Sequence, residues 1–317
     1  MKPIASLMLG MLFSAACAAA GLDDYKELVL PASPAAEAGK KNMTVMFIGV
    51  STLLFDDGET AFMTDGYFTR PAFNSLARIA PDRERITRSL QRAGVKSLAA
   101  VIPLHSHFDH ALDSPIVAQQ TGALLVGSKS TANIGRGYGL PEPRIRTVDN
   151  GESLSFGRFK ITFVVSSHLP ADFALGEITV PLSVPARASD FKMGDVYSLL
   201  VEHDGRTMLV QGSSGFIPGA LNGRKADVVY LGIGGLDMRD ESYRDAYWRE
   251  IVQAVGARRV LPIHWDNFFR SLDYPLVPFP GPGFDRSMGF LQARGKKDGV
   301  DIRLQLEWRP ADPFSGL

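Results

Sequence analysis

Three of the six histidines in this 317-residue chain lie close together, in the segment His105-Ser106-His107-Phe108-Asp109-His110. In an extended segment, side chains two positions apart share a face, so His105 and His107 can hold one ion together. A turn after this pair would direct Asp109 and His110 toward a second ion. Imidazole and carboxylate groups together are ligands for zinc, and manganese or iron can bind the same set. The segment therefore predicts a metal centre that ligands from elsewhere in the chain complete.

Two further histidines stand at the ends of apolar segments that are typical of strands. His168 follows the segment 161–165, and His264 follows 260–263. The histidine cluster itself follows 98–104, an almost unbroken apolar run that indicates a strand buried on both faces. Ligands gather at the carboxyl ends of strands in open α/β sheets, so we expect both histidines to converge with the cluster. Packing alone is a poor explanation for the cluster, because burying unpartnered polar groups costs on the order of several kcal/mol.

The elements that position these residues can be placed from hydropathy and turn residues. Asp57-Gly58 and Asp204-Gly205 each predict a hairpin turn between two strands. Asp82 predicts the start of a helix that reaches about residue 93. A last strand is expected over 301–308. His203 precedes the second turn, and we expect it to face water and to bind no metal.

The first twenty residues differ from the rest, because a basic start is followed by an uncharged run that ends in Ala18-Ala19-Ala20. This layout predicts a secretory signal peptide, and it is too short for a membrane span. Ser14-Ala15-Ala16-Cys17 loosely resembles a bacterial lipobox, which would leave a lipid anchor on Cys17 as the one contact with a membrane. We therefore expect an exported protein, periplasmic or secreted, or else an envelope lipoprotein.

Composition narrows the partners and the domain organisation. Thirty-four basic and 34 acidic residues balance, so no basic field would draw the chain to nucleic acid, and a small-molecule substrate is expected. The single cysteine excludes an intrachain disulfide and a cysteine metal site. Strands dominate the early half, and strands alternate with helices later. We predict a linker or N-terminal arm over 21–40 and a single α/β domain over 41–317.

At this point the sequence resembles the metallo-β-lactamase superfamily, whose signature His105-x-His107-x-Asp109-His110 matches. Other landmarks follow in the family's order between about residues 44 and 310: Asp65, His168, Gly212-Ser213-Ser214-Gly215 and Leu261-Pro262-Ile263-His264. Among the branches of this superfamily, the sequence most resembles the one that contains the ascorbate-6-phosphate lactonase. The resemblance implies a four-layer αβ/βα sandwich of two mixed β-sheets flanked by helices. It also implies one ion on His105, His107 and His168 and a second on Asp109, His110 and His264.

Two positions bear on how well the ions would be held. Most hydrolases of this family carry an aspartate at the glycine turn that bridges both metals, where this chain has Ser213. A neutral hydroxyl is a poor replacement for that carboxylate, so the number of bound ions stays open. Asp65 has two interpretations. It either fixes the tautomer of a ligand histidine through a hydrogen bond, or it caps the turn before Gly66.

The resulting hypothesis is a metal-dependent hydrolase. Metal-bound water has its pKa lowered to near neutrality, and the hydroxide would attack an ester, lactone, amide or phosphodiester. Asp109 would orient this nucleophile and relay a proton to the leaving group. We expect the loops 170–195 and 274–284 to form the walls of the substrate site. The alternative is a non-catalytic metal- or ligand-binding envelope protein on the same fold, in which Ser213 reflects lost chemistry.

Overall fold

The computed structural model describes residues 22–40, 42–171 and 173–317, so the predicted signal peptide and Cys17 lie outside the described residues. Apolar segments pair into two seven-stranded sheets. In the first sheet, neighbouring strands follow the order β14 (Pro310–Ala311), β1 (Thr44–Gly49), β2 (Thr52–Asp56), β3 (Ala61–Thr64), β4 (Ala100–Ile102), β5 (Leu124–Gly127) and β6 (Ile145–Thr147). The pairs from β3 to β6 are parallel, and those from β14 to β3 are antiparallel.

The second sheet repeats this mixed plan. Its order is β13 (Asp301–Ile302), β12 (Arg259–Ile263), β11 (Val228–Gly232), β10 (Arg206–Gln211), β9 (Val196–His203), β8 (Phe159–Ser166) and β7 (Ser153–Phe156). The hairpin turns expected at Asp57-Gly58 and Asp204-Gly205 connect β2 to β3 and β9 to β10, as antiparallel pairs. Both predictions are confirmed.

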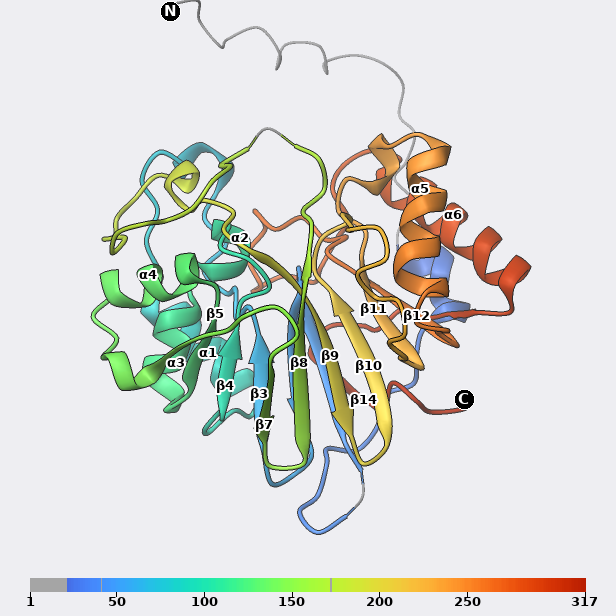
Figure 1. Ribbon diagram of the computed structural model, residues 1–317, viewed down its shortest axis with the longest axis horizontal. Helices are drawn as coiled ribbons and strands as arrows, with labels where there is room; N and C mark the ends of the chain where they lie inside the picture. Colours follow the sequence, from blue (N-terminus) through green and yellow to red (C-terminus); the bar gives the residue numbers. More distant parts are fainter. Residues whose placement is uncertain (1–21, 41, 172) are drawn as a thin grey trace, which may run out of the picture.

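Helices cover the outer side of each sheet (Figure 1). Beside the first sheet lie α1 (Arg83–Arg92), α3 (Ser114–Thr121) and α4 (Lys129–Gly137). Beside the second lie α5 (Glu241–Tyr247), which continues as a π-helix over Trp248–Gln253, and α6 (Gly283–Asp298). The layers run helices, sheet, sheet, helices, which confirms the predicted αβ/βα sandwich. No helix in the described ranges is long and apolar enough to cross a membrane.

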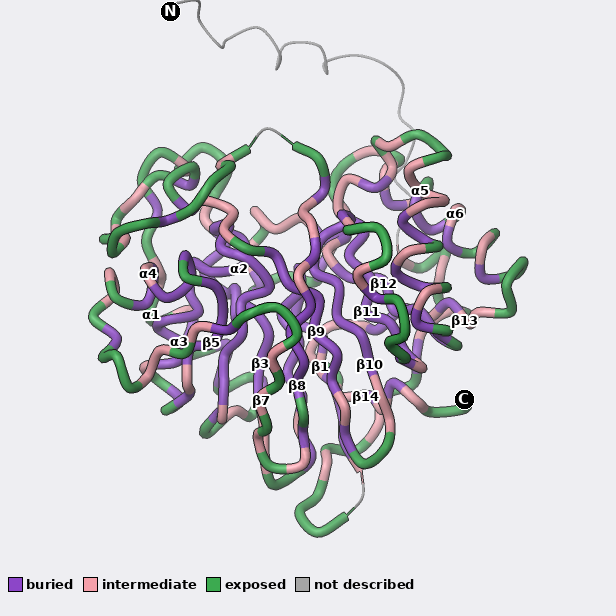
Figure 2. Tube along the Cα trace, in the orientation of Figure 1, coloured by how far each residue is buried: buried purple, intermediate pink, exposed green. Residues whose placement is uncertain are grey.

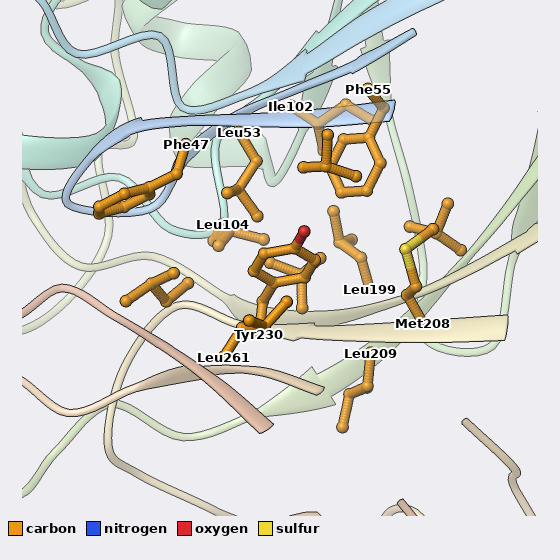
Figure 3. Packing of buried hydrophobic residues seen from close by; sticks show 14 of the residues in the cluster. Phe47, Leu53, Phe55, Ile102, Leu104, Leu199, Met208, Leu209, Tyr230 and Leu261 are labelled. Atoms are coloured by element: carbon orange, nitrogen blue, oxygen red, sulfur yellow. The ribbon is translucent and has the colours of Figure 1, made fainter. Parts of the chain in front are cut away.

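The inner faces of the sheets meet in one apolar core. Figure 2 shows that the central strands are buried along most of their length. Side chains from the first sheet, such as Phe47, Leu53 and Phe55, point toward side chains from the second, such as Tyr230 and Leu261 (Figure 3). The centroids of the Phe55 and Tyr230 rings lie 6.3 Å apart, edge to face. This rigid core fixes the strand ends from which the candidate site is built.

Local sequence signals explain the helix starts. The side chain of Asp82 accepts hydrogen bonds from the backbone N–H groups of Glu84 and Arg85, so it caps α1 as predicted.

The prediction of a single strand over 301–308 is wrong. The chain forms the short strand β13 in the second sheet and then crosses to β14 in the first sheet. Between them, the backbone of Leu304 hydrogen-bonds to Leu28 and Leu30 of the N-terminal arm instead of to a sheet. Buried and less buried side chains alternate along this segment between the two sheets, which gives the same sequence pattern as a strand.

The prediction that His203 faces water is wrong. Its side chain is 2% exposed, and its Nε2 lies 3.0 Å from Oδ2 of Asp57. Arg158 joins the two hairpin turns, because its guanidinium donates to Asp57 at 3.0 Å and to Asp204 at 2.8 Å. The hairpins of the two sheets pack against each other here, although their residues lie far apart in sequence. His203 belongs to neither candidate metal group within the described residues.

Candidate metal centre

Each predicted ligand follows a strand at the edge where the parallel strands end. The cluster follows β4, His168 follows β8, and His264 follows β12. The chain is extended at His107 and then forms the one-turn helix α2 (Phe108–Ala111). This helix is the turn that separates Asp109 and His110 from the preceding pair of histidines.

The first group consists of His105, His107 and His168, whose ligand atoms lie within 4.8 Å of one another. Nε2 of His105 is 3.1 Å from Nδ1 of His107, a spacing that suits two ligands of one tetrahedral ion. Nδ1 of His168 lies 2.7 Å from the carbonyl oxygen of Leu169. Since a carbonyl only accepts, Nδ1 of His168 carries the proton and Nε2 keeps its lone pair for the site.

The second group consists of Asp109, His110 and His264. Oδ2 of Asp109 lies 3.6 Å from Nε2 of His110 and 3.3 Å from Nε2 of His264. Nε2 of His110 is buried, and it has no hydrogen-bond partner among the residues that the structure describes. A buried lone pair that faces a carboxylate is unfavourable unless a proton or a cation lies between them. The donor set and this unpartnered nitrogen therefore fit a divalent metal ion.

The two groups are adjacent. The ring centroids of His105 and His110, which belong to different groups, lie 3.9 Å apart. Those of His110 and His264 lie 5.2 Å apart, and those of His105 and His168 lie 5.0 Å apart. Two ions held here would be neighbours, as one shared centre requires.

The electrostatic state of most ligands suits metal binding, which needs neutral imidazoles and ionised carboxylates. Burial lowers the pKa of His107 to about 4, and it also lowers the pKa values of His105 and His168. Burial acts to raise the pKa of Asp109, but His110 and His264 outweigh it and hold this pKa below its ordinary value. These side chains are therefore neutral histidines and a charged aspartate near pH 7.

His110 differs from the other histidines. Burial acts to lower its pKa, but the carboxylates of Asp65 and Asp109 outweigh burial and raise it. Oδ2 of Asp65 accepts from Nδ1 of His110 at 2.7 Å, and Oδ1 accepts from the backbone N–H of Leu104 at 2.9 Å. This geometry corresponds to the first interpretation of Asp65, as the partner that orients a ligand histidine.

Ser213 lies beside the loop that carries His168. Its hydroxyl accepts a hydrogen bond from the backbone N–H of Leu169 at 3.0 Å. Among the hydrogen bonds of the described residues, none joins this hydroxyl to the six candidate ligands. The turn that contains Ser213 fits tightly, because a Cβ on Gly215 would lie 2.3 Å from the backbone of His168. Ser213 therefore supports the position of His168 through the backbone.

The sequence reasoning did not single out two buried charged features next to the site. Asp113 accepts hydrogen bonds from the backbone N–H groups of Phe68 and Thr69 and from the Thr69 hydroxyl. Arg70 and Asp266 form an ion pair of 2.7 Å with both side chains fully buried. Asp266 stands two positions after His264, and this proximity is the one signal in the sequence that could have indicated it.

Comparisons with known proteins bear on the family and the fold of this chain. The family model described as "Beta-lactamase superfamily domain" matches residues 68–265, more than half of the chain. A UPF0173 metal-dependent hydrolase from Exiguobacterium sp. is 29% identical over 167 residues, which are 52% of this chain and 66% of that protein. A second one, from Chloroflexus aurantiacus, is 25% identical over 176 residues, with 55% and 66% covered. The chain thus spans just under two thirds of the length of these relatives.

Solved structures share the fold. A novel metallo hydrolase from the archaeon Ignicoccus hospitalis superposes with a TM-score of 0.51 at 14% identity, over 84% of this chain and 96% of that one. CmlA, a diiron beta-hydroxylase from Streptomyces venezuelae, gives 0.53 at 16% identity, over 87% of this chain and 55% of that one. At such identities the likeness concerns the fold alone. The family match, which covers the histidine cluster and His264, shows that this chain belongs to the metallo-β-lactamase superfamily.

Proposed function

We propose that this protein is a metal-dependent hydrolase with zinc as its metal. The main support is the convergence of six side chains from three strand ends into two adjacent groups of three ligand atoms. Nitrogen and carboxylate donors in this number suit zinc, and manganese or iron is the alternative. The two UPF0173 relatives are named as metal-dependent hydrolases, which supports the same general activity.

In this proposal His105, His107 and His168 hold the first ion, and Asp109, His110 and His264 hold the second. Bound divalent ions act as Lewis acids and lower the pKa of water, which makes hydroxide available at neutral pH. The carboxylate of Asp109 is ionised and 11% exposed, so while Oδ2 faces the ion, its other oxygen, Oδ1, can accept a proton and pass it to the leaving group. Asp65 holds the Nδ1 proton of His110, which keeps Nε2 turned toward the site.

The substrate in this proposal is an ester, lactone, amide or phosphodiester that water splits. The sequence features of residues 1–20 support action in the periplasm or outside the cell. N-terminal sequencing of the mature protein tests this part of the proposal, because a start at residue 21 or at Cys17 identifies the peptidase.

The direct test combines metal analysis with hydrolysis assays on the purified protein. Metal content is measured by elemental mass spectrometry, and generic esters, lactones, β-lactams and phosphodiesters are offered with and without a chelator. We expect activity that the chelator abolishes and added zinc restores. His107→Ala should lose both metal and activity, whereas His203→Gln, a matched change outside both groups, should keep its metal.

Two outcomes oppose the proposal in different ways. Turnover that is insensitive to chelator, or an active His107→Ala variant, would refute the metal mechanism. Full metal content without hydrolysis of any substrate class would instead favour the non-catalytic binding protein.

A further inference from the structure

We infer that the substrate carries an uncharged apolar group, an acyl chain or an aryl ring, that lies against a row of phenylalanines beside the metal centre. We call this row the aromatic rim, and it consists of Phe73, Phe173, Phe268, Phe269 and Phe279. The inference rests on the proposed hydrolase function and adds the substrate class to it.

The aromatic rim touches the candidate ligands from two sides. The Phe173 ring centroid lies 5.7 Å from that of His107, in the first metal group. The Phe268 ring centroid lies 5.8 Å from that of His264, in the second group. A substrate whose reacting bond is at the metal centre therefore has an aromatic face within reach on either side.

The rings form a continuous series that leads away from the centre. Phe268 contacts Phe269 and Phe279 at centroid distances of 4.5 and 5.0 Å, and Phe269 contacts Phe73 at 5.3 Å. The buried ring of Phe108, in α2 of the histidine cluster, lies between Phe173 and Phe268 at 6.5 and 6.2 Å. The metal-binding segment itself thus connects the two halves of the aromatic rim.

Several of these rings are exposed to solvent, although burying an apolar ring would be energetically favourable. Phe73 is 59% exposed, Phe173 43% and Phe279 40%. They come from three separate segments that follow β3, β8 and β12. Contiguous exposed apolar surface of this kind marks a binding site more often than a chance arrangement of single residues.

The charges around the centre favour an uncharged substrate over a phosphodiester. Within the described ranges, the ion pairs of the six ligand side chains involve only histidine and aspartate partners. The guanidinium of Arg70 ends in its buried pair with Asp266, that of Arg239 donates to the carbonyl oxygen of Pro170, and that of Arg270 lies over the Tyr274 ring at 5.1 Å. Phosphate recognition usually employs arginine or lysine aimed at the anion. An ester, lactone or amide with an apolar acyl or aryl part fits this site better.

A series of hydroxamates tests the inference by binding as well as by activity, since the hydroxamate group ligates metal and its tail samples the aromatic rim. Calorimetry on the zinc-loaded protein compares acetohydroxamate, hexanohydroxamate and benzohydroxamate. A methylene that the rim covers should raise affinity about fourfold. The alkyl and phenyl arms show which apolar group binds better. Hydrolysis of acetate, hexanoate and benzoate esters provides the parallel series in kcat/KM.

Variants then locate the effect. Phe173→Ala and Phe279→Ala remove exposed rings, so the fold should tolerate both changes. The double variant should lose most of the increase in hydroxamate affinity that the longer tail gives the native protein. Val180→Ala, an exposed apolar change in the same loop as Phe173, is the control and should leave the series unchanged.

The outcomes separate this inference from the proposed function. If acetohydroxamate binds but affinity does not increase with tail length, or if the increase survives the double variant, the aromatic rim is not the substrate surface. If the protein holds no metal and binds no hydroxamate, the proposed function fails first and the inference falls with it.

Discussion

Oδ2 of Asp65 lies 2.7 Å from Nδ1 of His110, and both side chains are completely enclosed by protein. The other oxygen of Asp65 accepts from the backbone N–H of Leu104, immediately before the histidine cluster. One carboxylate at the end of β3 therefore fixes both a ligand ring and the start of the segment that carries it. Such outer partners determine the tautomer and orientation of a metal-binding histidine.

Asp65→Asn should weaken metal binding by the second group about 10- to 100-fold. The amide Oδ1 can still accept from Leu104, but its NH₂ would face Nδ1 of His110. His110 would then carry its proton on Nε2, the atom that faces Asp109. Competition with a chromophoric chelator measures the affinity. Asp240→Asn, at the exposed N-cap of α5, is the matched control and should bind metal like the native protein. Equal affinities in both variants would contradict the role of Asp65.

Ser213→Ala should lower the free energy of unfolding by about 1–3 kcal/mol, because the buried N–H of Leu169 loses its acceptor. Urea unfolding measures this loss. Ser213→Asp keeps an acceptor and adds a negative charge near the site, so it should retain metal more strongly against a chelator. If Ser213→Asp loses metal instead, this position does not correspond to the family's bridging aspartate.

The ligand set was the part of the site most open to prediction from the sequence. His105, His107, Asp109 and His110 are neighbours in the chain, so local spacing alone indicates that they act together. His168 and His264 needed one further rule, that ligands gather at the carboxyl ends of strands in α/β folds, and here those ends belong to both sheets. The hairpin turn at Asp57-Gly58 and the helix cap at Asp82 were likewise predictable, because each depends on residues within a few positions in the chain.

Features that depend on distant partners were not predictable in this way. The burial of His203 depends on Asp57, which lies 146 positions earlier in the chain. The end of β13 at Ile302 depends on the N-terminal arm, whose residues Leu28 and Leu30 take the backbone hydrogen bonds of Leu304. The aromatic rim was predictable only in part, because Phe173 and Phe279 fall in the loops 170–195 and 274–284 that were expected to form the walls of the site, whereas Phe73, Phe268 and Phe269 fall outside both.

Arg70→Met should be strongly destabilising, by about 3–5 kcal/mol, because it leaves the carboxylate of Asp266 buried without its cation. Asp266 also accepts from the backbone N–H of Val50 at 2.7 Å, and the Val50 carbonyl accepts from the N–H of His264 at 2.7 Å. The same variant should therefore lose metal from the second group. Guanidinium unfolding and metal analysis provide the two measurements.

The double variant Arg70→Met/Asp266→Asn removes both charges and should recover most of that stability. An additive loss in the double variant would show that the ion pair is not the source of the effect.

Asp113 should make the stability of the protein fall as the pH rises from about 4 to 6. Burial raises the pKa of Asp113 from 3.8 to about 6, although hydrogen bonds from Thr69 and Phe68 act to lower it. Between these values the native state binds the proton more tightly than the unfolded chain, so raising the pH favours unfolding. Above about pH 6 both states are ionised and this contribution becomes constant. A shift of about 2 pKa units corresponds to about 3 kcal/mol.

Asp113→Asn isolates this contribution, because asparagine stays neutral and its amide can still accept from the backbone N–H groups of Phe68 and Thr69. Urea unfolding of both proteins at pH 4, 5, 6 and 7 gives the difference in unfolding free energy at each pH. The other titrating groups cancel in this difference. We expect the variant to gain stability relative to the native protein by up to about 3 kcal/mol between pH 4 and 7. A difference that stays constant over this range would mean that Asp113 is ionised in the native state throughout.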